Sequence, residues 1–141
     1  MVFRRQLKHV FRFPALICLL ATVSIRIAAA ADCNFSEGPC TKIAGNRTVT
    51  LDIYPKPPKA MQELTFMLTV TPCASLPETL VIDLGMPGMV MGRNQVVLKK
   101  TNPCTWKGTG IIVRCMSGRT LWQATILSGE LNNTAFTFDV R

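Results

Sequence analysis

Residues 48–140 of this 141-residue chain alternate between apolar and polar side chains with a period of two. The clearest case is Val49, Leu51 and Ile53, which alternate with two threonines and an aspartate. A period of two places successive side chains on opposite faces of a half-buried strand, and no stretch here has the period of a helix. The segments that follow this pattern are residues 48–53, 64–70, 80–84, 96–98, 106–115, 122–126 and 136–140.

Seven short strands separated by turns, without crossover helices, predict an all-β fold in which the strands form an antiparallel β-sandwich. Gly108 and Gly110 interrupt the fifth strand, which indicates a bulge or a place where another backbone comes close. The two sheets are expected to close over the large side chains of Phe66, Trp122, Phe136 and Phe138.

The first 31 residues have the pattern of a secretory signal peptide, with bases and no acid in residues 1–12, an apolar run in 13–25 and alanines at 28–31. The run is shorter than the ~20 residues of a spanning helix. We therefore expect a cleaved leader, with an uncleaved membrane anchor as the alternative. The expected organisation is a signal peptide (1–31), a disulfide-closed N-terminal segment (32–47) and a β-sandwich domain (48–141).

Much of the formal charge of +8 belongs to this leader, because five of the 16 Lys and Arg residues lie in it. The remainder holds 11 bases and all 8 acids, with no basic run longer than Lys99-Lys100, so the sequence gives no indication of nucleic-acid binding. The only histidine, His9, also lies in the leader, and the carboxylates are scattered along the strands. No imidazole base or carboxylate pair is available for catalysis, and we expect no enzyme.

Five cysteines follow the leader, and export would place them in an oxidising compartment where disulfides are the default. Cys33 and Cys40 enclose a short loop and are expected to pair. Cys73, Cys104 and Cys115 cannot all pair with one another. We expect one disulfide among these three, with the third thiol either free or bound to a soft metal.

Three methionines, Met86, Met89 and Met91, stand within six residues on a stretch broken by a Pro-Gly pair. Proline and glycine impose a turn there, so three thioethers are held on a bent piece of backbone. Thioethers select soft cations such as Cu(I), and Met116 or Cys115 of a later turn is a candidate fourth ligand. The alternative is that Met86 and Met91 pack into the end of the sandwich while Met89 faces solvent.

Several motifs of the chain, in this order, resemble the YtkA-like (FixH-related) domain family, and the likeness extends over residues 49–140. They are a strand ending in proline, Glu63-Leu64-Thr65-Phe66, Met86-Pro87-Gly88-Met89-Val90-Met91-Gly92 and Met116-Ser117-Gly118-Arg119-Thr120-Leu121-Trp122. Members of this family are small, exported or membrane-anchored bacterial domains. The resemblance implies that the sandwich is immunoglobulin-like and that the protein is exported to the periplasm.

The resemblance also implies a non-catalytic accessory domain that binds or carries Cu(I) and serves a copper-dependent or respiratory envelope protein. Contact with the membrane is then expected only through the leader, if it is kept. The chain departs from the family pattern in its five additional cysteines and in the absence of histidine after the leader. The alternative function is a metal-free structural or protein-interaction module of the envelope, which contacts its partner through the methionine turn and residues 55–59.

Overall fold

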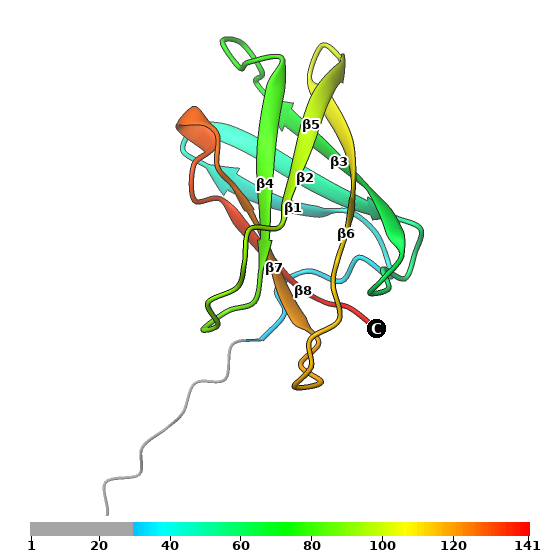
Figure 1. Cartoon of the computed structure of the whole chain (residues 1–141). Coiled ribbons are helices and arrows are strands. Elements are labelled where there is room, and N and C mark those ends of the chain that lie inside the picture. Colours follow the sequence, from blue (N-terminus) through cyan, green and yellow to red (C-terminus); the bar gives the residue numbers. More distant parts are fainter. Residues whose placement is uncertain (1–29) are drawn as a thin grey trace, which may run out of the picture.

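The computed structural model describes residues 30–141, which form an all-β structure with one short 3₁₀ helix (Figure 1). The expected signal peptide, residues 1–31, lies almost wholly outside the described residues. Within the described part, no helix has the length and hydrophobicity needed to cross a membrane. The elements are β1 (Cys40–Ala44), β2 (Arg47–Tyr54), β3 (Glu63–Thr71), β4 (Thr79–Gly85), β5 (Gln95–Asn102), β6 (Thr105–Ile111), β7 (Leu121–Ile126), η1 (Gly129–Leu131) and β8 (Ala135–Asp139).

Each of the seven expected strands corresponds to one of these elements, but the prediction of seven strands was wrong, because residues 30–141 contain eight. The additional strand is β1, which lies in the expected disulfide-closed N-terminal segment (32–47). Its five residues alternate only between half-buried and exposed, so its apolar pattern is weak. The fifth expected strand is also shorter than residues 106–115, since β6 ends at Ile111 and a loop follows.

The strands form one antiparallel sheet in the order β1-β2-β3-β6-β5-β4-β7-β8. The pairing of β5 with β6 is short and irregular, from Lys99 to Asn102 on β5. On either side of it lie four strands each, and the sheet curls at this point. Figure 1 shows β4 and β5 passing in front of β1, β2 and β3, so the two halves enclose a common core.

The inward faces of the strands supply this core, and the four aromatic residues expected there are fully buried. Two glycines let β5 cross β6 closely. A Cβ atom on Gly108 would stand 2.3 Å from the carbonyl oxygen of Val97, and one on Gly110 would stand 2.5 Å from Cγ2 of Val96. The close approach of another backbone, expected from the glycines, is therefore present at Gly108.

The edge strands of the sheet are β1 and β8, and a disulfide connects β1 to the segment around Cys33, which lies beside β8. The backbone amide of Cys33 donates to the carbonyl oxygen of Thr137 in β8, at 2.9 Å. Cys33 is bonded to Cys40, the first residue of β1, as expected from their short loop. The second disulfide joins Cys73 to Cys104, which connects the segment after β3 to the turn between β5 and β6.

Two charged side chains of β2 are buried, and both have polar partners. The guanidinium of Arg47 donates to the carbonyl oxygens of Pro72 and Ala74 and to the Glu130 carboxylate. Asp52 accepts from the Lys56 ammonium and from the amide of Ile53. Burial alone would raise the pKa of Asp52, but these hydrogen bonds outweigh it and hold the pKa below its ordinary value.

Candidate functional site

The methionine-rich segment begins where β4 ends and forms a tight turn. The amide of Met89 donates to the carbonyl oxygen of Met86 at 3.1 Å, which closes a four-residue β-turn. Pro87 occupies the second position and Gly88 the third, where φ is +72°. A positive φ at the third position is the requirement of a type II turn, and proline favours the second. The first and last residues of such a turn are neighbours, so Met86 and Met89 lie side by side.

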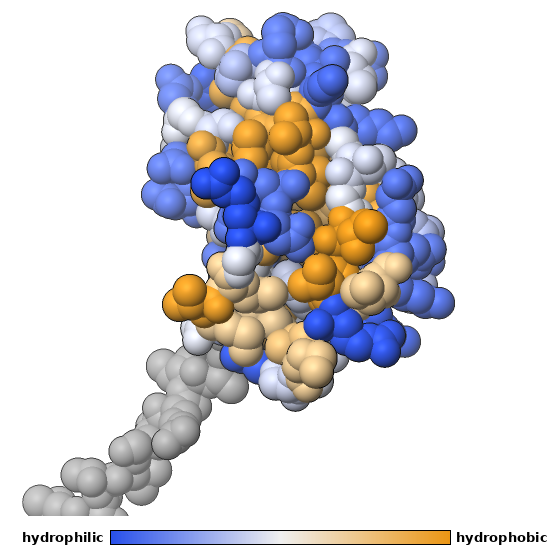
Figure 2. Space-filling model, viewed as in Figure 1, coloured by the Kyte–Doolittle hydropathy of each residue, from blue (hydrophilic) through white to orange (hydrophobic). Residues whose placement is uncertain are grey.

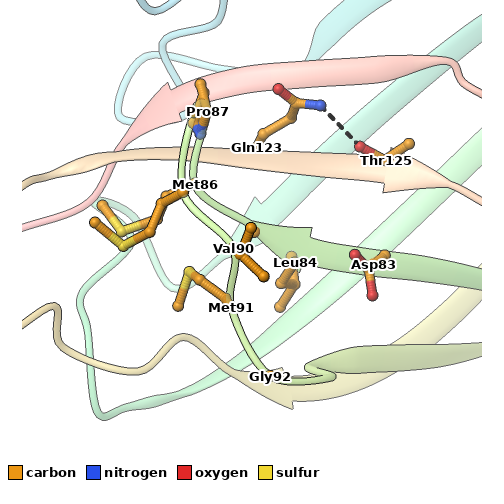
Figure 3. A pocket seen from close by; sticks show the side chains of 12 residues that line it. Asp83, Leu84, Met86, Pro87, Val90, Met91, Gly92, Gln123 and Thr125 are labelled. Atoms are coloured by element: carbon orange, nitrogen blue, oxygen red, sulfur yellow. Dashed lines mark hydrogen bonds between the residues drawn. The ribbon is translucent and has the colours of Figure 1, made fainter.

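A hollow of about 390 Å³ lies against this turn. Met86 is buried, Met89 and Met91 are half-buried, and all three are among the residues that line it. Figure 3 shows the side chains of Met86 and Met91 on the same side of the turn. All three methionines therefore line a single hollow at the end of β4, and they also pack with the hydrophobic core, Met86 as one of its members and Met89 and Met91 against it.

Polar groups reach the same hollow from β4 and β7. Asp83 is the one acid among the lining residues, and it stands opposite Thr125 in the pairing of β4 with β7. The side-chain amide of Gln123 donates to the Thr125 hydroxyl at 3.0 Å (Figure 3). Sequence reasoning missed these three residues, because no signal in the sequence says that β7 is the strand beside β4. All three alternate with buried residues of their strands, so they stand on the outward face of the sheet and supply a negative charge and polar groups on that side of the hollow.

A second turn follows β6 and contains Cys115. The amide of Gly118, with φ +74°, donates to the carbonyl oxygen of Cys115 at 3.1 Å. The Cys115 sulfur lies 2.9 Å from the Ser117 hydroxyl. Hydrogen bonds from the hydroxyl and the backbone amide of Ser117 lower the pKa of the Cys115 thiol, and the positive charge of Arg119 acts in the same direction. A lower pKa increases the fraction of thiolate, which is the nucleophilic and metal-binding form.

The two turns are held together at the same end of the molecule (Figure 1). The guanidinium of Arg119 donates to the carbonyl oxygen of Pro87 at 2.9 Å, which links residues 112–120 directly to the methionine turn. A second bond runs from the Asn94 side-chain amide to the carbonyl oxygen of Ile111, at 3.2 Å. These bonds hold the backbones of the two turns side by side.

The side chains of Cys115 and Met116 do not share the hollow of the three methionines. Cys115 lines a separate cavity of about 200 Å³, beside Trp122 and Val140. Met116 is fully exposed at the tip of its turn, with a relative exposure of 102%. Among residues 30–141, no three His, Cys, Asp or Glu side chains gather into a metal-binding group. Among the candidate ligands, only Met86, Met89 and Met91 line one common hollow, so they are the candidate ligands for a soft metal.

In comparisons with known protein families, with curated proteins and with solved structures, nothing matches this chain. The YtkA-like resemblance depends on the order and spacing of its motifs, and it stays a prediction.

Proposed function

We propose that this protein is a non-catalytic, periplasmic accessory domain of the YtkA-like type that binds or carries Cu(I). The observation that carries the proposal is the common hollow lined by Met86, Met89 and Met91 at the end of β4. Cu(I) accepts soft ligands, and neutral thioethers hold it without competing for protons. Its partner would be a copper-dependent or respiratory protein of the envelope.

The surroundings of the three thioethers suit a monovalent soft cation. Met86 is buried and the other two methionines are half-buried, so water has limited access to a bound ion. Asp83 lines the outward side of the same hollow and carries a negative charge. A site of neutral sulfur atoms should discriminate against Cu(II) and zinc, which favour imidazole and other harder ligands.

Cys115 and Met116 remain candidate fourth ligands, and their use would require the turn of residues 115–118 to fold over the hollow. The Arg119 bond to Pro87 already holds this turn beside the methionines. The lowered pKa of Cys115 makes its deprotonation easier, and the charge of the thiolate would strengthen Cu(I) binding. We also propose that the curled sheet is an immunoglobulin-like sandwich, with β1 as an addition to the seven-stranded pattern; the four strands on each side of the β5–β6 pairing support this.

The test is a titration of the purified protein with Cu(I) under anaerobic, reducing conditions against a competing chelator. We expect one Cu(I) per chain for the wild type and loss of that binding in a Met86→Leu/Met89→Leu/Met91→Leu variant. Leucine is close to methionine in volume, so the fold should persist. The matched control replaces two methionines outside the two turns, Met61→Leu and Met67→Leu, and should bind as the wild type does.

Equal Cu(I) binding by the turn variant and the control would refute the thioether site. A wild type that takes up no Cu(I) would exclude the copper function altogether and leave the metal-free envelope module. Free thiols should be counted in the same samples, because loss of the Cys115 thiol by oxidation would remove a candidate ligand.

A further inference from the structure

One end of the molecule carries exposed apolar side chains at the tips of its loops. We call this surface the loop end and define it as residues 86–94 and 112–120 together with Met61. Val90 and Met116 stand at two different tips, each with a relative exposure of 102%, and Met61 is 65% exposed. Val113 is also exposed. Figure 2 shows orange and tan side chains gathered over the lower end of the molecule, with deep-blue residues between them.

Hydrogen bonds between the loops fix the backbone that carries these tips. Arg119 bonds to the carbonyl oxygen of Pro87, which joins the loops of Val90 and Met116. The amide of Met61 donates to the carbonyl oxygen of Ile112 at 2.8 Å, which joins the loop after β2 to the same group. The exposed apolar side chains thus project from a support whose strands and loops are bonded to one another.

The charge of the loop end is positive. Residues 86–94 and 112–120 contain Arg93, Arg114 and Arg119, all exposed, and no acid. Within the described residues, none of the three arginines forms an ion pair; the four ion pairs found there use other bases. The acids nearest in the fold lie at the base of the loops: Asp83 at the hollow, Glu63 opposite Ile111 in the pairing of β3 with β6, and Asp139, which accepts from Thr120.

We propose that the loop end docks onto a membrane surface that contains anionic phospholipids. Apolar side chains at the tips would enter the boundary between head groups and acyl chains, while the arginines contact lipid phosphates. The separation of the apolar tips favours lipid over a protein partner. A protein interface needs a packed apolar centre surrounded by a polar rim, whereas Val90 and Met116 stand on different loops with arginines beside them, and a fluid interface can accept each tip separately.

This inference does not depend on Cu(I), because no metal ligand is needed for lipid contact. It adds a membrane contact through the folded domain to the contact expected through a retained leader. It also has a geometric consequence for the proposed function, since the methionine hollow lies beside Val90 and would open close to the membrane surface. A recipient of copper would then be a protein embedded in that membrane.

The experiment measures the fraction of protein that sediments with vesicles, using the protein as the cell produces it and without added metal. Vesicles of phosphatidylcholine with phosphatidylglycerol are compared with vesicles of phosphatidylcholine alone. We expect binding to the mixed vesicles, weakened by raising the salt from about 0.1 M to 0.5 M as screening increases. Every comparison is between variants with the same N-terminus, so any contribution of the leader is common to all.

The test variant is Val90→Asp, and its matched control is Val97→Asp, which places the same charge on an exposed valine of β5, away from the loop end. Val90→Asp should lower the vesicle partition coefficient about tenfold or more, as expected for one lost apolar anchor. Val97→Asp should leave it unchanged. In the same way, Arg114→Gln should reduce the coefficient roughly fivefold, and Lys99→Gln much less. Val90 is fully exposed, so its variant should keep the wild-type circular dichroism spectrum and thermal midpoint.

Equal partitioning of Val90→Asp and wild type would overturn the proposal, and so would equal binding to the two kinds of vesicle. A protein partner predicts a different result. In that case the protein would bind native membranes, lose this binding after protease treatment of those membranes, and ignore pure lipid vesicles, and the lipid proposal would be wrong.

Discussion

Replacing Gly108 or Gly110 of β6 by alanine should destabilise the fold, each by a different clash. Only the clash at Gly110 should be relieved by a second substitution. In Gly108→Ala the new methyl group would stand 2.3 Å from the Val97 carbonyl oxygen, whereas ordinary contacts begin at 3.4 Å. Strand β5 must therefore move by roughly 1 Å, because no substitution can remove a backbone oxygen. Overpacking of this kind costs about 1–3 kcal/mol or more, and we expect the upper end.

In Gly110→Ala the obstacle is a side-chain atom, Cγ2 of Val96 at 2.5 Å. We expect a cost of about 2 kcal/mol for this change and about 2 kcal/mol for Val96→Ala alone, which deletes two buried methyl groups and leaves a cavity. In the double variant the new methyl group at position 110 would occupy part of the space that Val96 gives up. The total cost should then be about 2 kcal/mol rather than about 4, a coupling of about 2 kcal/mol.

The assay is equilibrium unfolding in urea with the disulfides intact, read as the free energy of unfolding with the slope held common. Gly85→Ala in β4 is the matched control, because its Cβ would meet nothing within 4 Å and its φ is not positive. It should change stability by less than about 0.5 kcal/mol. Costs at Gly108 and Gly110 equal to that control, or strictly additive effects of Gly110→Ala and Val96→Ala, would refute the proposed crossing of β5 over β6.

Three further predictions concern charged and titratable groups. Arg47→Met should lower the free energy of unfolding in urea by about 2–3 kcal/mol, because several buried hydrogen bonds are lost. Glu130→Gln should lower it by less than about 1 kcal/mol, since that carboxylate is exposed. Equal losses in the two variants would contradict this. Asp52 has a lowered pKa in the fold, so its contribution to stability is present above pH 3.8, its ordinary pKa, and is lost as the pH falls below that value. In Asp52→Asn the free energy of unfolding should therefore fall less steeply as the pH is lowered through this range. Ser117→Ala should raise the pKa of Cys115 and slow its alkylation at neutral pH, and an unchanged pH–rate profile would exclude the hydrogen bond of the Ser117 hydroxyl as a cause.

The strands were predictable from the sequence because one face of each is fully buried. Leu64, Phe66, Leu68 and Val70 of β3 are inaccessible to solvent, and the residues between them are not, which is the condition under which a period of two is unambiguous. Strand β1 lacks this condition, because it is an edge strand without a fully buried residue. Local pattern therefore identified the central strands and missed this edge.

The candidate site was predictable as far as it is local. Met86, Met89 and Met91 share a hollow because Pro87 and Gly88 bend the chain between them, and both the turn and its residues are written in the sequence. Asp83 and the residues of β7 enter the hollow through strand pairing over about 40 residues of separation, which no local pattern encodes.

The cysteines show the same division between local and long-range information. Cys33 and Cys40 are seven residues apart, and their pairing follows from a short loop. The bond between Cys73 and Cys104 spans 31 residues and forms because the segment after β3 meets the β5–β6 turn in the folded sheet. That meeting also decides that Cys115, which follows β6 on the opposite end of the strand, keeps a free thiol among the described residues.

The bond between Cys33 and Cys40 adds a covalent, redox-dependent link between the two edges of the sheet. The bond links β1 to the segment beside β8. Strands β1 and β8 are the edges of the sheet, and unpaired backbone groups at such edges can pair with another chain. Where the two thiols are reduced, β1 has no covalent link to the segment beside β8. Formation of the disulfide holds the two edges in place and should reduce edge-to-edge aggregation. Under reducing conditions β1 and the segment beside β8 would be held only by backbone pairing and packing, and the protein should self-associate more than in its oxidised form.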